Sequence, residues 1–178
     1  MGFDGVLEKD INLSVALLLQ QFLEQSGMQV ILTRSDDNGI YENSDSVRDK
    51  KNSDMKNREK LMKESGADAF ISIHMNKFPD GKYSGPQVFY SGNHEQSKVL
   101  AERIQKSMTE ELNPAMKRDI KKADSGIYLL KKAKIPAVLV ECGFLSNMQE
   151  QQKLMDEAYR KRIAWAIYCG VLQYLEDI

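Results

Sequence analysis

The sequence is poor in residues that would make its fold depend on cross-links, since its 178 residues include two cysteines, four prolines and two histidines. Two cysteines cannot form the disulfide framework of a small secreted domain. Cys142 lies in a predicted strand and Cys169 in a predicted helix, and we interpret both as small buried thiols. A chain of this length buries roughly 70% of its unfolded surface. We therefore expect a single domain over residues 1–178 with its own hydrophobic core.

The sequence also lacks an excess of charge and a long apolar run. Its 25 Lys and Arg nearly balance its 26 Asp and Glu, so it has no broad positive field of the kind that binds nucleic acids. No apolar run, residues 15–19 included, approaches the roughly 20 residues of a membrane span. The first residues do not show the basic and then apolar pattern of a signal peptide. These absences exclude nucleic-acid binding and membrane spanning as first hypotheses.

Helical and strand patterns alternate along the chain. Apolar residues three and four apart predict helices, and short β-branched runs predict strands. Such alternation is typical of an α/β fold, here a single three-layer domain with a mostly parallel twisted sheet flanked by helices. Residues 34–56 are polar and are expected to form a long loop. The predicted strands are 28–33, 69–73, 87–90 and 137–141, and the predicted helices are 10–26, 57–65, 95–112, 148–157 and 159–175.

Three titratable residues lie at the ends of predicted elements. His74 follows one strand, Glu141 ends a buried strand and Glu8 begins the first helix. Singly, His74 is explained by structural hydrogen bonding and Glu8 by the helix dipole, whereas a carboxylate in a buried strand needs a partner or a chemical role. Ligands bind beyond the carboxyl ends of such strands. Together the three residues suit a zinc hydrolase, with imidazole and carboxylate ligands and a further carboxylate to move protons.

Several segments resemble the zinc-dependent N-acetylmuramoyl-L-alanine amidases of bacterial cell walls. The resemblance covers the chain from Glu8 to its end, and its most specific parts are Ser-Ile-His-Met-Asn and Val-Glu-Cys-Gly-Phe-Leu-Ser-Asn. Within the family, shorter stretches resemble the sporulation amidases that prepare the spore cortex for germination. The segments are Glu8–Asp10, Leu32–Arg34, Ala67–Asn76 and Pro136–Asn147 for the family, and Tyr83–Tyr90 and Gly126–Leu129 for the subgroup.

The resemblance implies a specific role for each matching residue. Glu8 and His74 would be ligands of one zinc ion, Glu141 the general base and acid, and Asn76 a residue that binds substrate. The substrate would be peptidoglycan, cleaved at the amide between the lactyl group of N-acetylmuramic acid and the first L-alanine of the stem peptide. The family also implies export to the cell wall or spore cortex, and an accessory activator protein is a conceivable partner.

One feature departs from the family. Its first strand, and a histidine-glycine-glycine motif that supplies another zinc ligand, lie before the glutamate, but here only seven residues precede Glu8 and none is histidine. His94 is expected to be a surface cap. We therefore expect the domain to be N-terminally incomplete, without its first strand and third zinc ligand. Two alternatives follow: a metal-poor, inactive binding module with an amidase-like fold, and a different zinc peptidase.

Lysines and one arginine gather in two stretches, Lys117–Lys122 and Lys131–Lys134. These stretches suit the anionic glycan or the carboxylates of a stem peptide, but a solvated surface is the commoner explanation.

Overall fold

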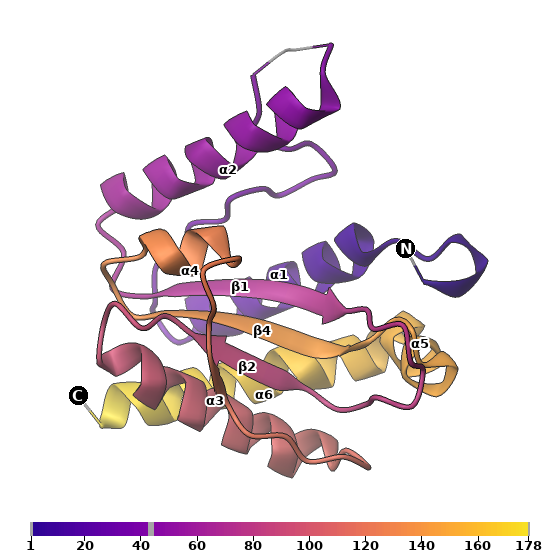
Figure 1. Ribbon diagram of the computed structural model, residues 1–178. Helices are drawn as coiled ribbons and strands as arrows, with labels where there is room; N and C mark the ends of the chain where they lie inside the picture. Colours follow the sequence, from indigo (N-terminus) through magenta and orange to yellow (C-terminus); the bar gives the residue numbers. More distant parts are fainter. Residues whose placement is uncertain (1, 43–44, 178) are drawn as a thin grey trace.

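The structure is a computed structural model that describes residues 2–42 and 45–177. Figure 1 shows its helices arranged around a central sheet. In chain order the elements are η1 (Phe3–Gly5), α1 (Glu8–Gln25), α2 (Val47–Glu64), β1 (Phe70–Asn76), β2 (Gln87–Tyr90), α3 (Gln96–Leu112), β3 (Lys121–Lys122), α4 (Tyr128–Lys132), β4 (Ala137–Phe144), α5 (Met148–Met155) and α6 (Glu157–Glu176).

The sheet has the strand order β1-β4-β2-β3. β4 pairs with β1 in parallel and with β2 in the antiparallel sense, and β3 runs parallel to β2. Most of β4 is buried, as expected for a near-continuous apolar run in a strand covered on both faces. The predicted α/β fold class, with a mixed and mostly parallel sheet between helical layers, is therefore confirmed.

Each face of the sheet has its own apolar cluster. Val138, Val140 and Cys142 of β4 face the larger cluster, which includes core residues of α1, α3 and α6. Ala137 and Leu139, which alternate with them, face a smaller cluster with residues of α2 and α4. Because side chains alternate along a strand, every other residue of β4 points toward the side that α4 covers in Figure 1. Within the described residues, no helix is long and apolar enough to cross a membrane.

Two sequence predictions about the first third of the chain are wrong. Residues 28–33 do not form a strand, because an extended run becomes a strand only when a neighbour completes its backbone hydrogen bonds. The expected loop over 34–56 is also too long, since α2 begins at Val47. Ser46 caps α2 through the amide of Asp49, and Arg58 pairs with Asp54 one turn away. Local bonds of this kind stabilise a helix whose residues are mostly exposed and which therefore has little apolar periodicity.

Both cysteines are free thiols as predicted, but only Cys142 is buried as expected. Cys142 is buried in β4, Cys169 is half-buried in α6, and both are free thiols. Burial raises the pKa of the Cys142 thiol well above its ordinary value, with a smaller contribution from the charge of Glu141. Cys142 is therefore a neutral apolar side chain rather than a nucleophile.

Candidate active site

Strand register brings three polar residues into one row across the sheet. His74 of β1 pairs with Glu141 of β4, and Glu141 pairs in turn with Gln87 of β2. Paired residues on neighbouring strands project from the same face, and this row lies two residues beyond Leu139, on the face that carries α4. The row lies toward the carboxyl ends of β1 and β4, where open α/β sheets bind ligands.

A β-bulge changes the face that the end of β4 presents. Two steps along β1, from His74 to Asn76, correspond to three steps along β4, from Glu141 to Phe144. The extra residue turns Phe144 to the same face as Asn76 and Glu141. Asn76, predicted to bind substrate, therefore lies on the face of His74 at the end of β1, and its backbone oxygen accepts a hydrogen bond from the amide of Leu145.

Glu8 reaches this row from the first turn of α1. Its Oε1 lies 3.0 Å from Nδ1 of His74 and accepts hydrogen bonds from the Met75 amide at 3.2 Å and from Asn12 Nδ2 at 3.2 Å. Burial by itself would raise the pKa of Glu8, but these hydrogen bonds outweigh it and hold the pKa below its ordinary value. Glu8 is thus an anionic carboxylate held against the imidazole, although 66 residues separate the two in sequence.

Glu141 is the partly buried carboxylate of the row. Its Oε2 atom is buried and has no hydrogen-bond partner in the described part of the chain. Burial raises the pKa of Glu141 to about 7; the nearby His74 opposes this increase, and the negative charge of Glu8 adds to it. A carboxyl with this pKa exchanges its proton near neutrality, as a general acid or base must.

The chemistry of the donor set fits two positions of a zinc site. Zinc binds imidazole nitrogen and carboxylate oxygen, and His74 and Glu8 present one of each within hydrogen-bonding distance. The unpartnered oxygen of Glu141 lies on the same row. In residues 2–42 and 45–177, no group of three or more His, Cys, Asp or Glu side chains is arranged to hold a metal. The chain thus brings together two candidate ligands and one candidate proton carrier.

His94 takes no part in this cluster. Its Nδ1 accepts a hydrogen bond from the Gln96 amide at the start of α3. His94 therefore lies just before α3, as expected, but it is half-buried and the N-cap residue of the helix is Glu95.

Sequence reasoning singled out no residue in the part of the site beyond Glu141, although it noted the stretches Tyr83–Tyr90 and Lys117–Lys122 that contain several of its residues. Gln87 is buried and carries the row onto β2, and Arg118 donates a hydrogen bond from Nη1 to Gln87 Oε1 at 3.3 Å. The rings of Tyr83 and Phe144 stack 6.3 Å apart, and Phe78 meets Tyr83 edge to face at 4.9 Å. These residues come from separate loops and strands, so their sequence spacing carried no signal.

Gly85 lets the backbone after Tyr83 pack closely against the segment that carries Arg118. Its φ is +84°, and a β-carbon placed on it would lie 2.2 Å from the carbonyl oxygen of Met116. Gly85→Ala is expected to destabilise the protein by more than the roughly 1–2 kcal/mol of the left-handed backbone alone. Gly27→Ala is the matched control, because Gly27 has φ +81° and open space around it. Equal shifts in the thermal midpoints of the two variants would contradict the close approach.

Comparison with protein families gives one match over nearly the whole chain. The sequence pattern of a family described as N-acetylmuramoyl-L-alanine amidase matches residues 1–173. The chain is 35% identical over 173 residues to the germination-specific N-acetylmuramoyl-L-alanine amidase of Bacillus subtilis, which covers 97% of this chain and 72% of the relative. It is 31% identical to the amidase LytC of the same organism, but spans only 32% of that longer protein.

Solved structures agree with this match. The CwlD amidase of Clostridioides difficile, determined in complex with the GerS lipoprotein, superposes with a TM-score of 0.96 at 43% identity, over 100% of this chain and 91% of that one. A second N-acetylmuramoyl-L-alanine amidase from Clostridium difficile gives a TM-score of 0.84 at 32% identity, over 97% of this chain and 86% of that one.

Proposed function

The chain belongs to the N-acetylmuramoyl-L-alanine amidase family of peptidoglycan hydrolases, and from this membership we propose that it cleaves the amide between the lactyl group of N-acetylmuramic acid and the L-alanine of the stem peptide. The observation that supports this most directly is the pair of Glu8 and His74 on the same row as Glu141, whose Oε2 atom is buried and unpartnered in the described part of the chain. The pair suits a metal ion, and a carboxyl with a pKa of about 7 suits the proton transfers of amide hydrolysis.

Zinc is the metal that the donor set and the family favour, and Glu8 and His74 are the residues of this chain that would hold it. When bound, zinc supplies positive charge that polarises the amide carbonyl and lowers the pKa of water. A negative Glu8 suits this role, because carboxylate ligands bind metal in the deprotonated form.

Glu141 has the role of moving the proton. It accepts a proton from the attacking water, whose oxygen forms the new bond to the lactyl carbonyl carbon. As the carbon–nitrogen bond breaks, Glu141 passes that proton to the nitrogen of L-alanine, which leaves as an amine. A pKa of about 7 balances the two transfers, since the group must be basic in the first and acidic in the second. Asn76, on the same face at the end of β1, is in position to contact the substrate.

The relatives indicate where this activity belongs. The chain is similar to a germination-specific amidase and to a CwlD amidase, and we propose that it acts in the cell wall, and in spore cortex in particular. The CwlD relative was solved with a lipoprotein, and an accessory protein of that kind is the partner to test first.

The proposal is tested by release of stem peptide from purified peptidoglycan, measured as new L-alanine amino termini, together with zinc content. Zinc bound by the wild-type chain is expected to be lost in His74→Ala, with affinity lower by about 100-fold or more. His94→Ala is the matched control, because this histidine caps α3 away from the site, and it should leave both measurements unchanged.

The same experiment separates the alternatives. If the wild-type chain binds no stoichiometric zinc and releases no peptide, it is instead a metal-poor binding module with an amidase fold. That reading is favoured by one observation, that the described residues bring together only two candidate ligands. Cleavage of peptides that carry no glycan would identify a different zinc peptidase.

A further inference from the structure

Arg118 stands at the far end of the site row with its guanidinium held in place. Its Nε donates to the carbonyl oxygen of Ser84 at 2.9 Å and its Nη1 to Gln87 Oε1 at 3.3 Å. Gln87 Nε2 in turn donates to the carbonyl oxygen of Asp119 at 2.8 Å. These bonds tie the Arg118 segment to β2 at the residue that is paired with Glu141.

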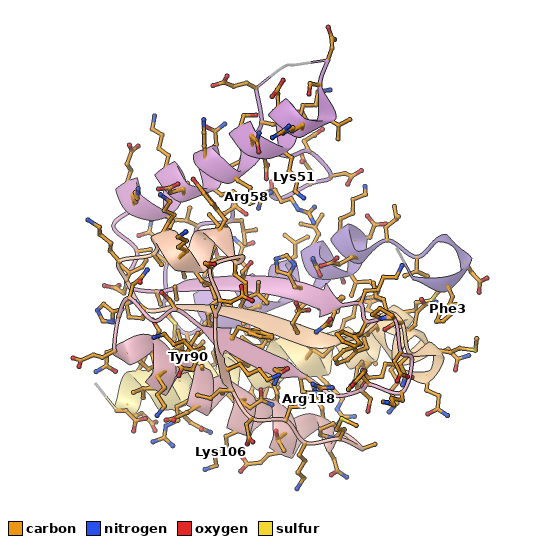
Figure 2. The ribbon with its side chains drawn as sticks, in the orientation of Figure 1. Phe3, Lys51, Arg58, Tyr90, Lys106 and Arg118 are labelled. Atoms are coloured by element: carbon orange, nitrogen blue, oxygen red, sulfur yellow. The ribbon has the colours of Figure 1, made fainter. Side chains whose placement is uncertain are left out.

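Two aromatic rings flank the guanidinium. Its central carbon lies 4.8 Å from the centroid of Phe144 and 5.5 Å from that of Tyr83. Stacking of this kind fixes the plane of the guanidinium group and leaves the N–H groups at its edge free to donate hydrogen bonds. Figure 2 shows Arg118 next to β2, the strand that carries Gln87. Its side chain is only partly exposed.

The cation has no anion of its own. In residues 2–42 and 45–177, no ion pair includes Arg118. The positive charge of Arg118 lowers the pKa of the Glu150 carboxyl, but burial has the larger effect and raises that pKa overall. The two carboxylate oxygens of Glu150 accept hydrogen bonds from the backbone amides of Gly85 and Phe144, each at 2.9 Å. Three of the five guanidinium donors have acceptors in the described part of the chain. One N–H on each terminal nitrogen is therefore left to donate to a carboxylate.

The position of Arg118 fits a peptide that starts at the site. Neighbouring strands lie roughly 5 Å apart, so Gln87 is about 10 Å across the sheet from His74. An extended peptide covers about 3.5 Å per residue. A stem peptide whose scissile amide lies over His74 and Glu141 therefore brings its second or third residue to Arg118.

We propose that Arg118 binds a free carboxylate on the stem peptide about two residues beyond the scissile amide, and that this contact makes the site prefer acidic stem peptides over amidated ones. The inference rests on the proposed amidase function and adds a substrate preference to it. Arg118 acts on binding and not on the chemical step, so its effect falls on KM.

The test uses two muropeptides that are identical except that the second stem residue carries a free carboxylate or a carboxamide. The wild-type chain is expected to favour the carboxylate form by about 10-fold or more in kcat/KM. Arg118→Gln should remove that preference, because it lowers kcat/KM for the carboxylate form by about 10-fold or more relative to the carboxamide form. Arg118→Lys, which keeps the charge without the fork, should retain part of it. Lys117→Gln is the matched control, since it makes the same charge change at the exposed neighbouring residue and should preserve the preference.

A purely structural role for Arg118 predicts equal losses on both muropeptides, and this result would overturn the inference, as would a wild-type chain without preference. If the wild-type chain cleaves neither, the proposed function fails, and calorimetric binding of the same muropeptides then decides the inference. Affinity that depends on the carboxylate and is lost in Arg118→Gln supports it, whereas equal affinities reject it.

Discussion

Replacing Glu141 by glutamine is expected to lower kcat for stem-peptide release by about 10³-fold, while zinc binding is kept. General acid–base groups contribute about 10²–10⁴-fold, and Glu141 is the partly buried carboxyl of the site row with a pKa near 7. The glutamine side chain has nearly the same shape as glutamate but cannot accept a proton near neutral pH. Full hydrolysis by Glu141→Gln, with unchanged zinc content, would refute the assigned role.

Gln87→Glu offers a comparison on the same row. It places a carboxyl one strand further from His74, so it should not restore activity in the Glu141→Gln background. Recovery of peptide release in the double variant would show that catalysis does not require the carboxylate at the position on β4 that pairs with His74.

The same Glu141→Gln variant is expected to be more stable than wild type at pH 8 when both proteins are stripped of metal by a chelator. The pKa of Glu141 in the folded protein, about 7, lies above its ordinary value of 4.5. The folded state therefore binds more protons than the unfolded state between these values, and stability falls as pH rises from about 4.5 to 7. The full penalty, present above pH 7, is of order 3 kcal/mol. Chemical denaturation at pH 4 and pH 8 measures it: the two proteins should converge at pH 4, and equal stabilities at pH 8 would show that Glu141 is not strained by burial.

A large loss of stability is also expected for Gly170→Ala in α6. A β-carbon on Gly170 would lie 2.6 Å from the α-carbon of Ile104 and 3.0 Å from the carbonyl oxygen of Arg103. These are backbone atoms of α3, so relief requires the two helices to separate and disturbs the core that Ile104 helps to form. Overpacking costs about 1–3 kcal/mol, offset by up to about 1 kcal/mol of helix propensity. We expect a net loss of about 2 kcal/mol, or a thermal midpoint lower by roughly 4–8 °C.

Cys169→Ala is the matched control for this helix. Cys169 is the adjacent residue of α6 and is half-buried, so its replacement should change stability by only about 0.5 kcal/mol. A midpoint for Gly170→Ala at or above that of wild type would mean that α3 and α6 adjust without cost.

Local patterns predicted much of the fold because they report local energetics. The buried apolar run of β4 and the apolar spacing of α1, α3 and α6 correspond closely to the elements observed. The failures have the same origin. Residues 28–33 have the side chains of a strand, but strand formation depends on a partner far away in sequence. α2 lacks an apolar stripe, and its capping and ion pairs escaped a search for hydrophobic periodicity.

The sequence by itself determined the chemistry of the site. A histidine after one strand, a carboxylate in a buried strand and a glutamate at a helix start had to lie near the same sheet edge, because parallel strands end on the same side. Only the tertiary structure decided the rest: that His74, Glu141 and Gln87 form one row, that a bulge turns Phe144 onto it, and that Arg118 completes it. Register, bulges and loop closure are set by packing between segments tens of residues apart, and that packing leaves no periodicity in the sequence.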